Sequence, residues 1–284
     1  MKTQKVWFIT GASRGFGLEI ARAALAAGDQ VVATVRSNPA QLAVTLDNHP
    51  NLSVVQMDVV QEDQVQTAVQ QSIARFGRVD VLVNNAGYGM VTAIEEATDA
   101  EVRRQYDTNV FGLLNVTRAV LPYLRQQKSG HIINISSLFG YDTVPGWGLY
   151  GSTKFAVEGI SKGLAVELAP LGIHVTAVAP GLFSTDFLST DSYVAAKTII
   201  DDYQETVSQM RSGADALHGN QPGDPKKFAQ VILQVANTDR PPLHLPVGKD
   251  AVAMYQNNVA KMAQDIEAWL PVATSTDHDH RVAA

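Results

Sequence analysis

One passage of this sequence, SLFGYDTVPGWGLYGSTK (137–154), carries residues that could do acid–base chemistry. Ser137 follows an apolar, strand-like run, and Tyr150 and Lys154 stand four residues apart where a helical pattern begins. Side chains at this spacing share one face of a helix. A phenol has a pKa of about 10, and a nearby ammonium group lowers it toward neutrality. The passage is therefore either an aromatic surface loop or the reactive part of an enzyme.

A second candidate is the glycine turn TGASRGFG (10–17), which lies between an apolar run and a helical pattern. Glycines there allow a tight turn and close approach of the backbone to a pyrophosphate, while a helix N-terminus offers free N–H groups. The spacing is G-x3-G-x-G, and no Gly-Lys-Ser/Thr of a Walker loop follows. We interpret the turn as a dinucleotide site; the alternative is a turn that only packs strand against helix.

The end of the second apolar run indicates which dinucleotide. NAD-binding chains place an acid there for the ribose 2′-hydroxyl, whereas this chain reads Thr34-Val35-Arg36-Ser37. Arg36 and Arg14 offer guanidinium groups suited to a 2′-phosphate. They are otherwise two ordinary surface arginines. We therefore expect NADP(H) in preference to NAD(H).

Short apolar runs alternate with helical patterns through the first two thirds of the chain. This alternation predicts βαβ units and an α/β fold, a Rossmann-type doubly wound parallel sheet flanked by helices in one domain, 1–284. The expected strands are 5–10, 30–35, 52–59, 79–87, 131–137 and 172–181, and the expected helices 17–28, 61–76, 99–126 and 148–169.

Beyond Gly181 the pattern loosens. The segment 182–224 is long for a connection, so we expect a substrate loop or lid with a helix near 191–211. We then expect a helix from Pro225, an edge strand at 241–248, a helix at 250–270 and a frayed tail from 273. The apolar residues of that last helix are expected to face the core: Val252, Tyr255, Val259, Met262, Ile266 and Trp269.

Composition narrows the function classes. The 284 residues are 45% hydrophobic and 18% charged with a net charge of -6, and Lys and Arg form no cluster suited to nucleic acid or an anionic membrane. No apolar run approaches the roughly 20 residues of a membrane span, and the N-terminus leads into a strand rather than a signal peptide. With no cysteine, and with His278 and His280 in the polar tail, we expect no metal site and a cytoplasmic protein.

The motifs together carry a family resemblance. TGASRGFG, Asp58-Val59, Asn84-Asn85-Ala86-Gly87, Asn109, Ser137, Tyr150-x3-Lys154 and Pro180-Gly181 follow the order and spacing of the short-chain dehydrogenase/reductase superfamily. The chain resembles its single-domain branch from residue 5 to about 185. The C-terminal part is more weakly similar to the 17β-hydroxysteroid dehydrogenase subgroup.

The resemblance implies a role for each of four catalytic residues. Tyr150 is the general acid in carbonyl reduction and the base in alcohol oxidation. Lys154 assists it and holds the nicotinamide ribose. Ser137 donates a hydrogen bond to the substrate oxygen, and Asn109 is the structural and proton-relay asparagine.

The resemblance also implies binding residues. Those for the cofactor are Gly11, Ser13, Arg14, Gly15, Phe16, Gly17, Arg36, Asp58, Val59, Asn85, Ala86, Gly87, Tyr150, Lys154, Pro180, Gly181 and Thr185. The turn at 84–87 and Asp58 have the alternative of only packing the sheet or ending a strand. For the substrate we expect contacts from Ser137, Phe139, Trp147, Tyr150 and Phe183, within apolar walls that suit a hydrophobic molecule.

The leading hypothesis is thus an oxidoreductase that moves a hydride between NADP(H) and a small carbonyl or secondary-alcohol substrate. A non-catalytic NADP(H)-binding regulator is the alternative, although it has no need of all four catalytic residues. Relatives often pair through the helices that here lie at about 99–126 and 150–169. We therefore expect either a homodimer formed through these helices or a monomer.

Overall fold

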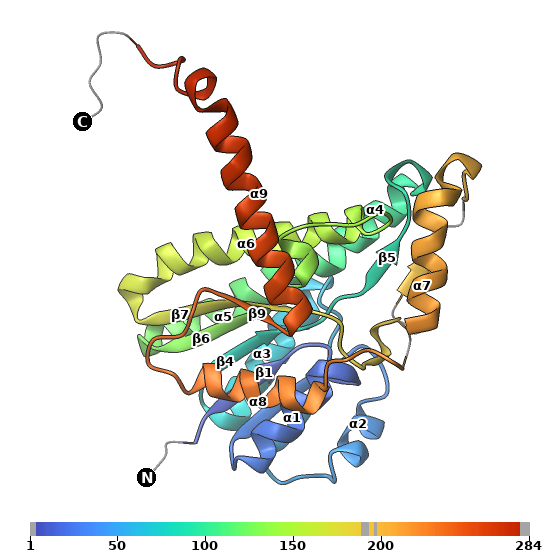
Figure 1. The fold of residues 1–284 in the computed structure, drawn as a ribbon. Helices are drawn as coiled ribbons and strands as arrows, with labels where there is room; N and C mark the ends of the chain where they lie inside the picture. The colour runs from blue at the N-terminus through green and yellow to red at the C-terminus, as the bar shows by residue number, and fades with distance from the viewer. Residues whose placement is uncertain (1–3, 189–192, 196–197, 218, 279–284) are drawn as a thin grey trace.

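The computed structural model describes residues 4–188, 193–195, 198–217 and 219–278 (Figure 1). Seven parallel strands form its main sheet in the order β3-β2-β1-β4-β6-β7-β9. Strand order reverses between β1 and β4, and ligands of such sheets bind beyond the carboxyl ends at this reversal. The strands are β1 Val6–Ile9, β2 Gln30–Val35, β3 Leu52–Gln56, β4 Val81–Asn84, β6 Gly130–Ile135, β7 Ile173–Pro180 and β9 His244–Val247. The predicted α/β fold is confirmed, with β9 as the expected edge strand.

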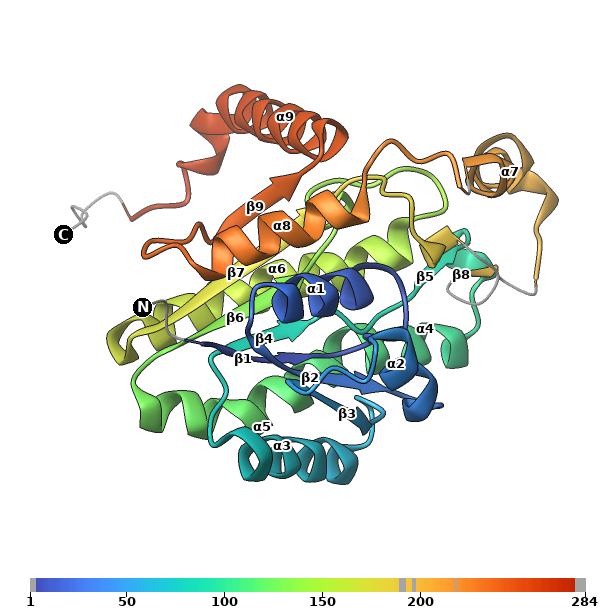
Figure 2. The same ribbon diagram turned by 90° about the horizontal axis from the view of Figure 1, so that it is seen from below.

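Helices cover both faces of this sheet (Figure 2). Side chains of α1 (Gly15–Ala26), α2 (Pro39–Thr45) and α8 (Pro225–Ala236) belong to the hydrophobic cluster on one face. The cluster on the other face takes its helical side chains from α3 (Glu62–Phe76), α5 (Gly112–Gln127) and α6 (Gly148–Leu168).

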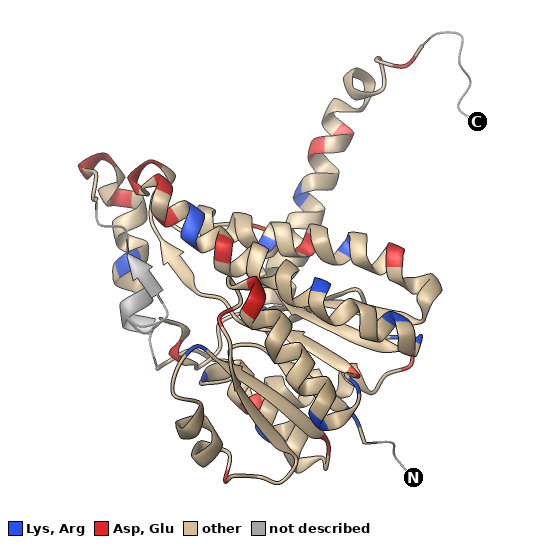
Figure 3. Cartoon of the chain, turned by 180° about the vertical axis from the view of Figure 1, so that it is seen from behind, with Lys and Arg blue, Asp and Glu red and all other residues tan. Residues whose placement is uncertain are grey.

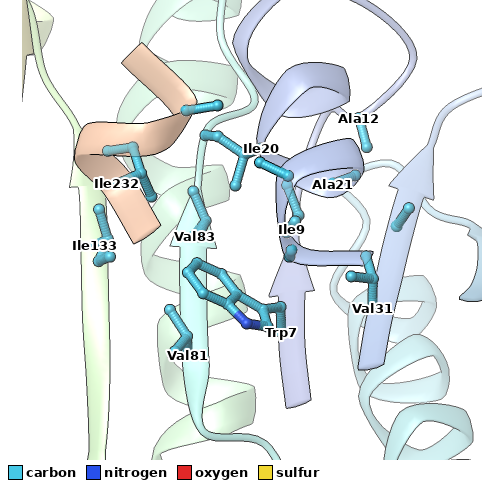
Figure 4. Close-up of a cluster of buried hydrophobic side chains, with 14 of the residues drawn as sticks. Trp7, Ile9, Ala12, Ile20, Ala21, Val31, Val81, Val83, Ile133 and Ile232 are labelled. Carbon is cyan, nitrogen blue, oxygen red and sulfur yellow. The ribbon is translucent and has the colours of Figure 1, made fainter. Parts of the chain in front are cut away.

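Strand β1 shows how the chain builds these two clusters. Trp7 and Ile9 pack toward α1 and α8 (Figure 4), whereas Phe8, between them, packs into the opposite cluster. All three are fully buried, and each such side chain stabilises the fold by about 1.5–3 kcal/mol. The indole N–H of Trp7 donates to Asp29 at 2.9 Å, so the polar edge of the ring is satisfied. The sheet is therefore a rigid base for the loops at its carboxyl edge.

The long helix expected at 99–126 is present but not uniform. It consists of α4 (Asp99–Tyr106), a π-helical turn at Asp107–Phe111, and α5. Thr98 caps the start of α4: its side chain accepts from the Glu101 backbone N–H, and the Glu101 side chain accepts from the Thr98 backbone N–H. π-Helical turns are rare and often lie at functional sites. Asn109 sits within this one.

A small second sheet lies beside the main one. Strand β5 (Gly89–Val91) pairs in parallel with β8 (Tyr193–Ala195). The helix expected near 191–211 is therefore wrong at its start, where the backbone of β8 pairs with β5, whereas the chain is helical from 201 onward as expected. The chain continues through helical turns at 201–203 and 204–208, and α7 occupies Gln209–Leu217.

Helix α9 (Lys249–Ala273) departs most from expectation. Its first turns pack beside β9, where Ala251 is buried and the Tyr255 ring lies 4.7 Å from that of Tyr141. Farther on, α9 extends away from the body (Figure 1). Five of the six expected core-facing residues are exposed, from 37% at Val252 to 65% at Trp269, with Val259, Met262 and Ile266 between; Tyr255 is half-buried. The expectation is wrong for these five because apolar spacing defines a helix face, while the direction of the helix decides what covers it.

Charged residues are dispersed over the surface with both signs mixed (Figure 3). Among the described residues, no helix combines the length and apolar content needed to cross a bilayer. The same residues contain no group of three or more His, Asp or Glu side chains placed to bind a metal ion.

A buried histidine makes stability depend on pH. His131 on β6 is 5% exposed, and its Nε2 lies 2.9 Å from the Thr176 hydroxyl. Burial lowers its pKa to about 3, with further lowering by His174 and Lys5. Below about pH 6.5 the unfolded chain therefore binds a proton that the folded chain does not, and stability falls.

We expect His131 to account for a loss of about 1.4 kcal/mol in the free energy of unfolding between about pH 7.5 and 5.5. Urea denaturation of wild type and His131→Asn at both pH values measures this share. On acidification, the free energy of unfolding of the variant should fall by about 1.4 kcal/mol less than that of wild type. An equal loss in both proteins would show that another group is responsible.

Candidate active site

The glycine turn and the turn after β4 are joined by hydrogen bonds. The Asn85 side-chain amide donates to the carbonyls of Thr10 and Gly11 at 2.9 and 3.0 Å. The Thr10 hydroxyl in turn accepts from the backbone N–H groups of Asn85 and Ala86, at 2.9 and 3.0 Å. Asn85 thus holds together the loops that follow β1 and β4. This structural use of the 84–87 turn is the alternative that the sequence left open.

Glycine is required in this turn by space as well as by conformation. Gly11 has a φ of +65°, and a Cβ on it would lie 3.0 Å from the Cα of Ala86. A Cβ on Gly17 would lie 2.5 Å from the Gly11 carbonyl and 2.6 Å from the Asn85 amide nitrogen. The first turn of α1 therefore lies directly against the loop, with its N-terminus open.

A cavity of about 590 Å³ lies over these loops at the carboxyl edge of the sheet. It brings together nearly all residues singled out from the sequence, including Arg14, Arg36 and Asp58 at one part and Ser137, Tyr150 and Lys154 at another. Two of them do not line it. Gly17 packs beneath the turn, and Asn109 lies behind Gly87.

Sequence reasoning missed several lining residues, among them Tyr88 and Arg104. Burial raises the pKa of the Tyr88 hydroxyl, while the charges of Arg104 and Arg36 lower it. The three side chains therefore lie near one another at the rim. Tyr88 directly follows the 84–87 turn, a signal that was available. Arg104 on α4 carries no local signal, since only the fold brings α4 to this edge.

The three proposed reacting residues meet at the ends of β6 and α6. Ser137 caps a helical turn by accepting from the Phe139 N–H at 3.2 Å, and its hydroxyl also hydrogen-bonds Tyr150. Lys154 donates from Nζ to the Ile135 carbonyl at 2.8 Å, and that nitrogen lies 5.7 Å from the centre of the Tyr150 ring. Ser137, Tyr150 and Lys154 are each at most 7% exposed.

Burial dominates the ionisation of this group. It raises the pKa of Tyr150 well above the ordinary value, and the hydrogen bond from Ser137 opposes only part of this. It lowers the pKa of Lys154 to about 8, opposed by the charge of Glu158. In this structure the burial of the phenol therefore exceeds any lowering of its pKa by the Lys154 ammonium, which donates to the Ile135 carbonyl. Tyr150 is a protonated acid at neutral pH.

Asn109 connects the π-helical turn to both sides of the site. Its Nδ2 donates to the Tyr88 carbonyl at 3.0 Å and to the Thr153 hydroxyl at 3.1 Å, and its Oδ1 accepts from the Tyr88 N–H at 3.1 Å. A Cβ on Gly87 would come within 3.1 Å of that oxygen and 3.8 Å of Lys154 Nζ. A side chain at position 87 would therefore press on Asn109 and contact Lys154.

Aromatic rings form the wall around Tyr150. Phe139 and Trp147 stack with centres 5.0 Å apart, and the Tyr150 ring lies 5.5 Å from both Trp147 and Phe187. Phe183 also lines the cavity, but its ring packs against Phe16 and Phe228 in the core cluster. The wall beside the phenol is therefore apolar.

Comparison with known proteins identifies the family. A family model described as short chain dehydrogenase matches residues 5–193. The oxidoreductase BOA17 of Botryotinia fuckeliana is 41% identical over 267 residues, covering 93% of this chain and 96% of its own length. The chain belongs to the short-chain dehydrogenase family.

Solved structures agree with this assignment. A short-chain dehydrogenase from Streptomyces avermitilis superposes with a TM-score of 0.90 at 38% identity, covering 97% of this chain and all of that one. ElxO with NADP bound matches at 29% identity with a TM-score of 0.72, covering 88% of this chain and all of that one. The fold and family are thus those of an oxidoreductase, and one of the solved structures similar to this chain contains NADP.

The residues of this chain fit such a dinucleotide. The cavity is continuous from the open N-terminus of α1, past the space that Gly11 leaves beside Ala86, to Tyr150 and Lys154. Free N–H groups at a helix start favour a pyrophosphate. The lining arginines favour further negative charge at the rim.

The close packing of Gly17 can be tested by stability. Gly17→Ala places a methyl group against a backbone carbonyl that cannot move away, so we expect a loss of about 1–3 kcal/mol in the free energy of unfolding. Gly163→Ala is the matched control, because nothing lies within 4 Å of its Cβ position in α6. That control should gain up to about 1 kcal/mol. Urea denaturation measures both, and two equal gains would contradict the packing described above.

Proposed function

We propose that this protein is an NADP(H)-dependent carbonyl reductase or secondary-alcohol dehydrogenase acting on an apolar substrate. The meeting of Ser137, Tyr150 and Lys154 on one cavity with the glycine turn supports this most strongly. Membership of the short-chain dehydrogenase family and the NADP complex of a neighbour support it independently.

In the reductive direction, a dinucleotide held by the glycine turn, Arg14 and Arg36 would supply the hydride for the carbonyl carbon. Tyr150, protonated because burial raises its pKa, gives its hydroxyl proton to the substrate oxygen. Ser137 donates a hydrogen bond to the same oxygen as negative charge develops there. Lys154, with a pKa of about 8, is the nearby positive charge that stabilises the tyrosinate left behind. Asn109 fixes the backbone of Tyr88 and binds the hydroxyl of Thr153, the residue before Lys154.

Two features support NADP(H) over NAD(H). Arg14 and Arg36 line the cavity near the glycine turn, and no acid ends β2. Arg104 adds a third guanidinium near Tyr88. Three guanidinium groups that line one cavity favour the doubly charged 2′-phosphate.

The aromatic wall supports a hydrophobic ketone or alcohol as the substrate. A homodimer remains a prediction; Phe111 and Phe155, on the elements expected to pair, are 53% and 47% exposed. The alternative function, a regulator that binds NADP(H) without turnover, is separated from the proposed one by activity alone.

Replacing the proposed acid tests the chemistry. With a panel of aliphatic, aromatic and steroid ketones, wild type should oxidise NADPH, followed by its absorbance. Tyr150→Phe removes the only proton donor of that ring, so we expect kcat to fall by about 10²–10⁴ while NADPH still binds. A variant as fast as wild type would refute the role of Tyr150. A wild type that binds NADPH but reduces no ketone would favour the regulator.

Cofactor preference can be tested at the rim. Arg36→Asp should raise the KM for NADPH by about tenfold or more and improve the relative use of NADH, because a charged hydrogen bond is replaced by repulsion. Arg118→Asp makes the same charge change on α5, where the side chain is 61% exposed. Steady-state kinetics with both cofactors should show no shift in this control. An unchanged ratio in Arg36→Asp would remove the basis for the preference.

A further inference from the structure

A buried carboxylate lies where the segment 198–217 meets the body of the protein. Glu96 ends the helical turn Ile94–Glu96 that follows β5, and its side chain is 0% exposed. Its Oε2 accepts from the Ala93 N–H at 2.8 Å, within its own turn. Its Oε1 accepts from the Ile200 N–H at 3.0 Å, across to the segment. The Glu96 carboxylate therefore binds both the helical turn of the body and the segment 198–217.

Arg211, on α7, makes the second link from the segment to the same carboxylate. Its Nη2 contacts Glu96 Oε2, and the side chain is 13% exposed. Burial alone would raise the pKa of Glu96, but the hydrogen bonds from Ile200 and Ala93 and the guanidinium together lower it. The carboxylate is therefore charged at neutral pH, and the pair is ionic.

The guanidinium uses only one of its three nitrogens in this pair. Nε and Nη1 of Arg211 are buried and have no hydrogen-bond partner among the described residues. Strong Arg–carboxylate pairs are commonly bidentate. The Glu96–Arg211 pair is therefore a single-contact ion pair, which holds the segment less firmly than a bidentate pair would.

The segment that Glu96 holds is part of the cavity wall. Met210 and Gly213, on either side of Arg211, line the cavity. Val207 and Met210 pack over Gly146, where a Cβ would lie 3.3 Å and 3.8 Å from them. Gly146 directly precedes Trp147 of the aromatic wall. Movement of this segment would therefore open the cavity beside Tyr150.

We propose that Glu96 and Arg211 are positioning residues that hold the segment 198–217 closed against the substrate end of the cavity, so that substrate passes when their ion pair separates. The pair touches no reacting atom and acts through the wall residues it places. The kinetic part of this inference rests on the proposed function, whereas its structural part does not.

The chain offers a matched control on the same segment. Tyr203 donates its hydroxyl proton to Glu95 at 2.7 Å, and this hydrogen bond is exposed. Exposed polar contacts contribute little to stability. Tyr203→Phe therefore removes one link between the segment and the same helical turn without touching the buried pair.

The experiment is hydrogen exchange by mass spectrometry on the full-length protein, comparing peptides from 198–217 with peptides from β6 and α6. Glu96→Gln and Arg211→Met should speed exchange in 198–217 by about tenfold or more, because local opening becomes easier. Arg211→Lys, which keeps the charge, should restore most of the protection. Tyr203→Phe should match wild type. The same variants, assayed with NADPH and a ketone, should raise the KM for the ketone and leave the KM for NADPH within about twofold.

Unchanged exchange in Glu96→Gln and Arg211→Met would overturn the proposal. So would an increase spread equally over β6 and α6, which indicates a general loss of stability, or an equal effect of Tyr203→Phe. If wild type reduces no ketone, the proposed function fails, and the exchange pattern still decides whether the pair holds the segment.

Discussion

The whole site depends on the contact between the Asn85 amide and the backbone of the glycine turn. This contact joins the loops after β1 and β4 where strand order reverses, and it leaves no room for a side chain on Gly11 or Gly17. Helix α1 can then begin directly at the cavity with its N–H groups available. A polar side chain used for packing thus creates the place where a charged ligand would bind.

Burial is the second shared constraint, and it acts differently on each ionisable group. Tyr150 and Lys154 lie beneath an aromatic wall, so the neutral form of each is favoured. The Lys154 ammonium keeps its charge below about pH 8 with help from Glu158 and the Ile135 carbonyl. Burial thus keeps the Tyr150 phenol protonated at neutral pH.

The sequence was sufficient for features set by local pattern. Apolar runs of β-branched residues predicted the central strands, and fixed spacing predicted which residues would meet at their carboxyl edge. Helix α9 shows what pattern cannot supply, because its apolar face was visible but the direction in which α9 leaves β9 was not. Strand β8 is a second case, since its pairing with β5 overrides a helix-like sequence. Arg104 reaches the rim only through the path of α4.

The cavity lining has a consequence for how the protein is made. Its residues run from Gly11, after the first strand, to Met254, in the last helix. A growing chain can bury β1, β2 and β3 early, since these strands are neighbours in the sheet. The substrate end of the cavity, however, has no complete wall until α9 has left the ribosome. The lining is therefore complete only in the full chain, and a truncated chain that keeps the glycine turn would lack the part of the wall that Met254 forms.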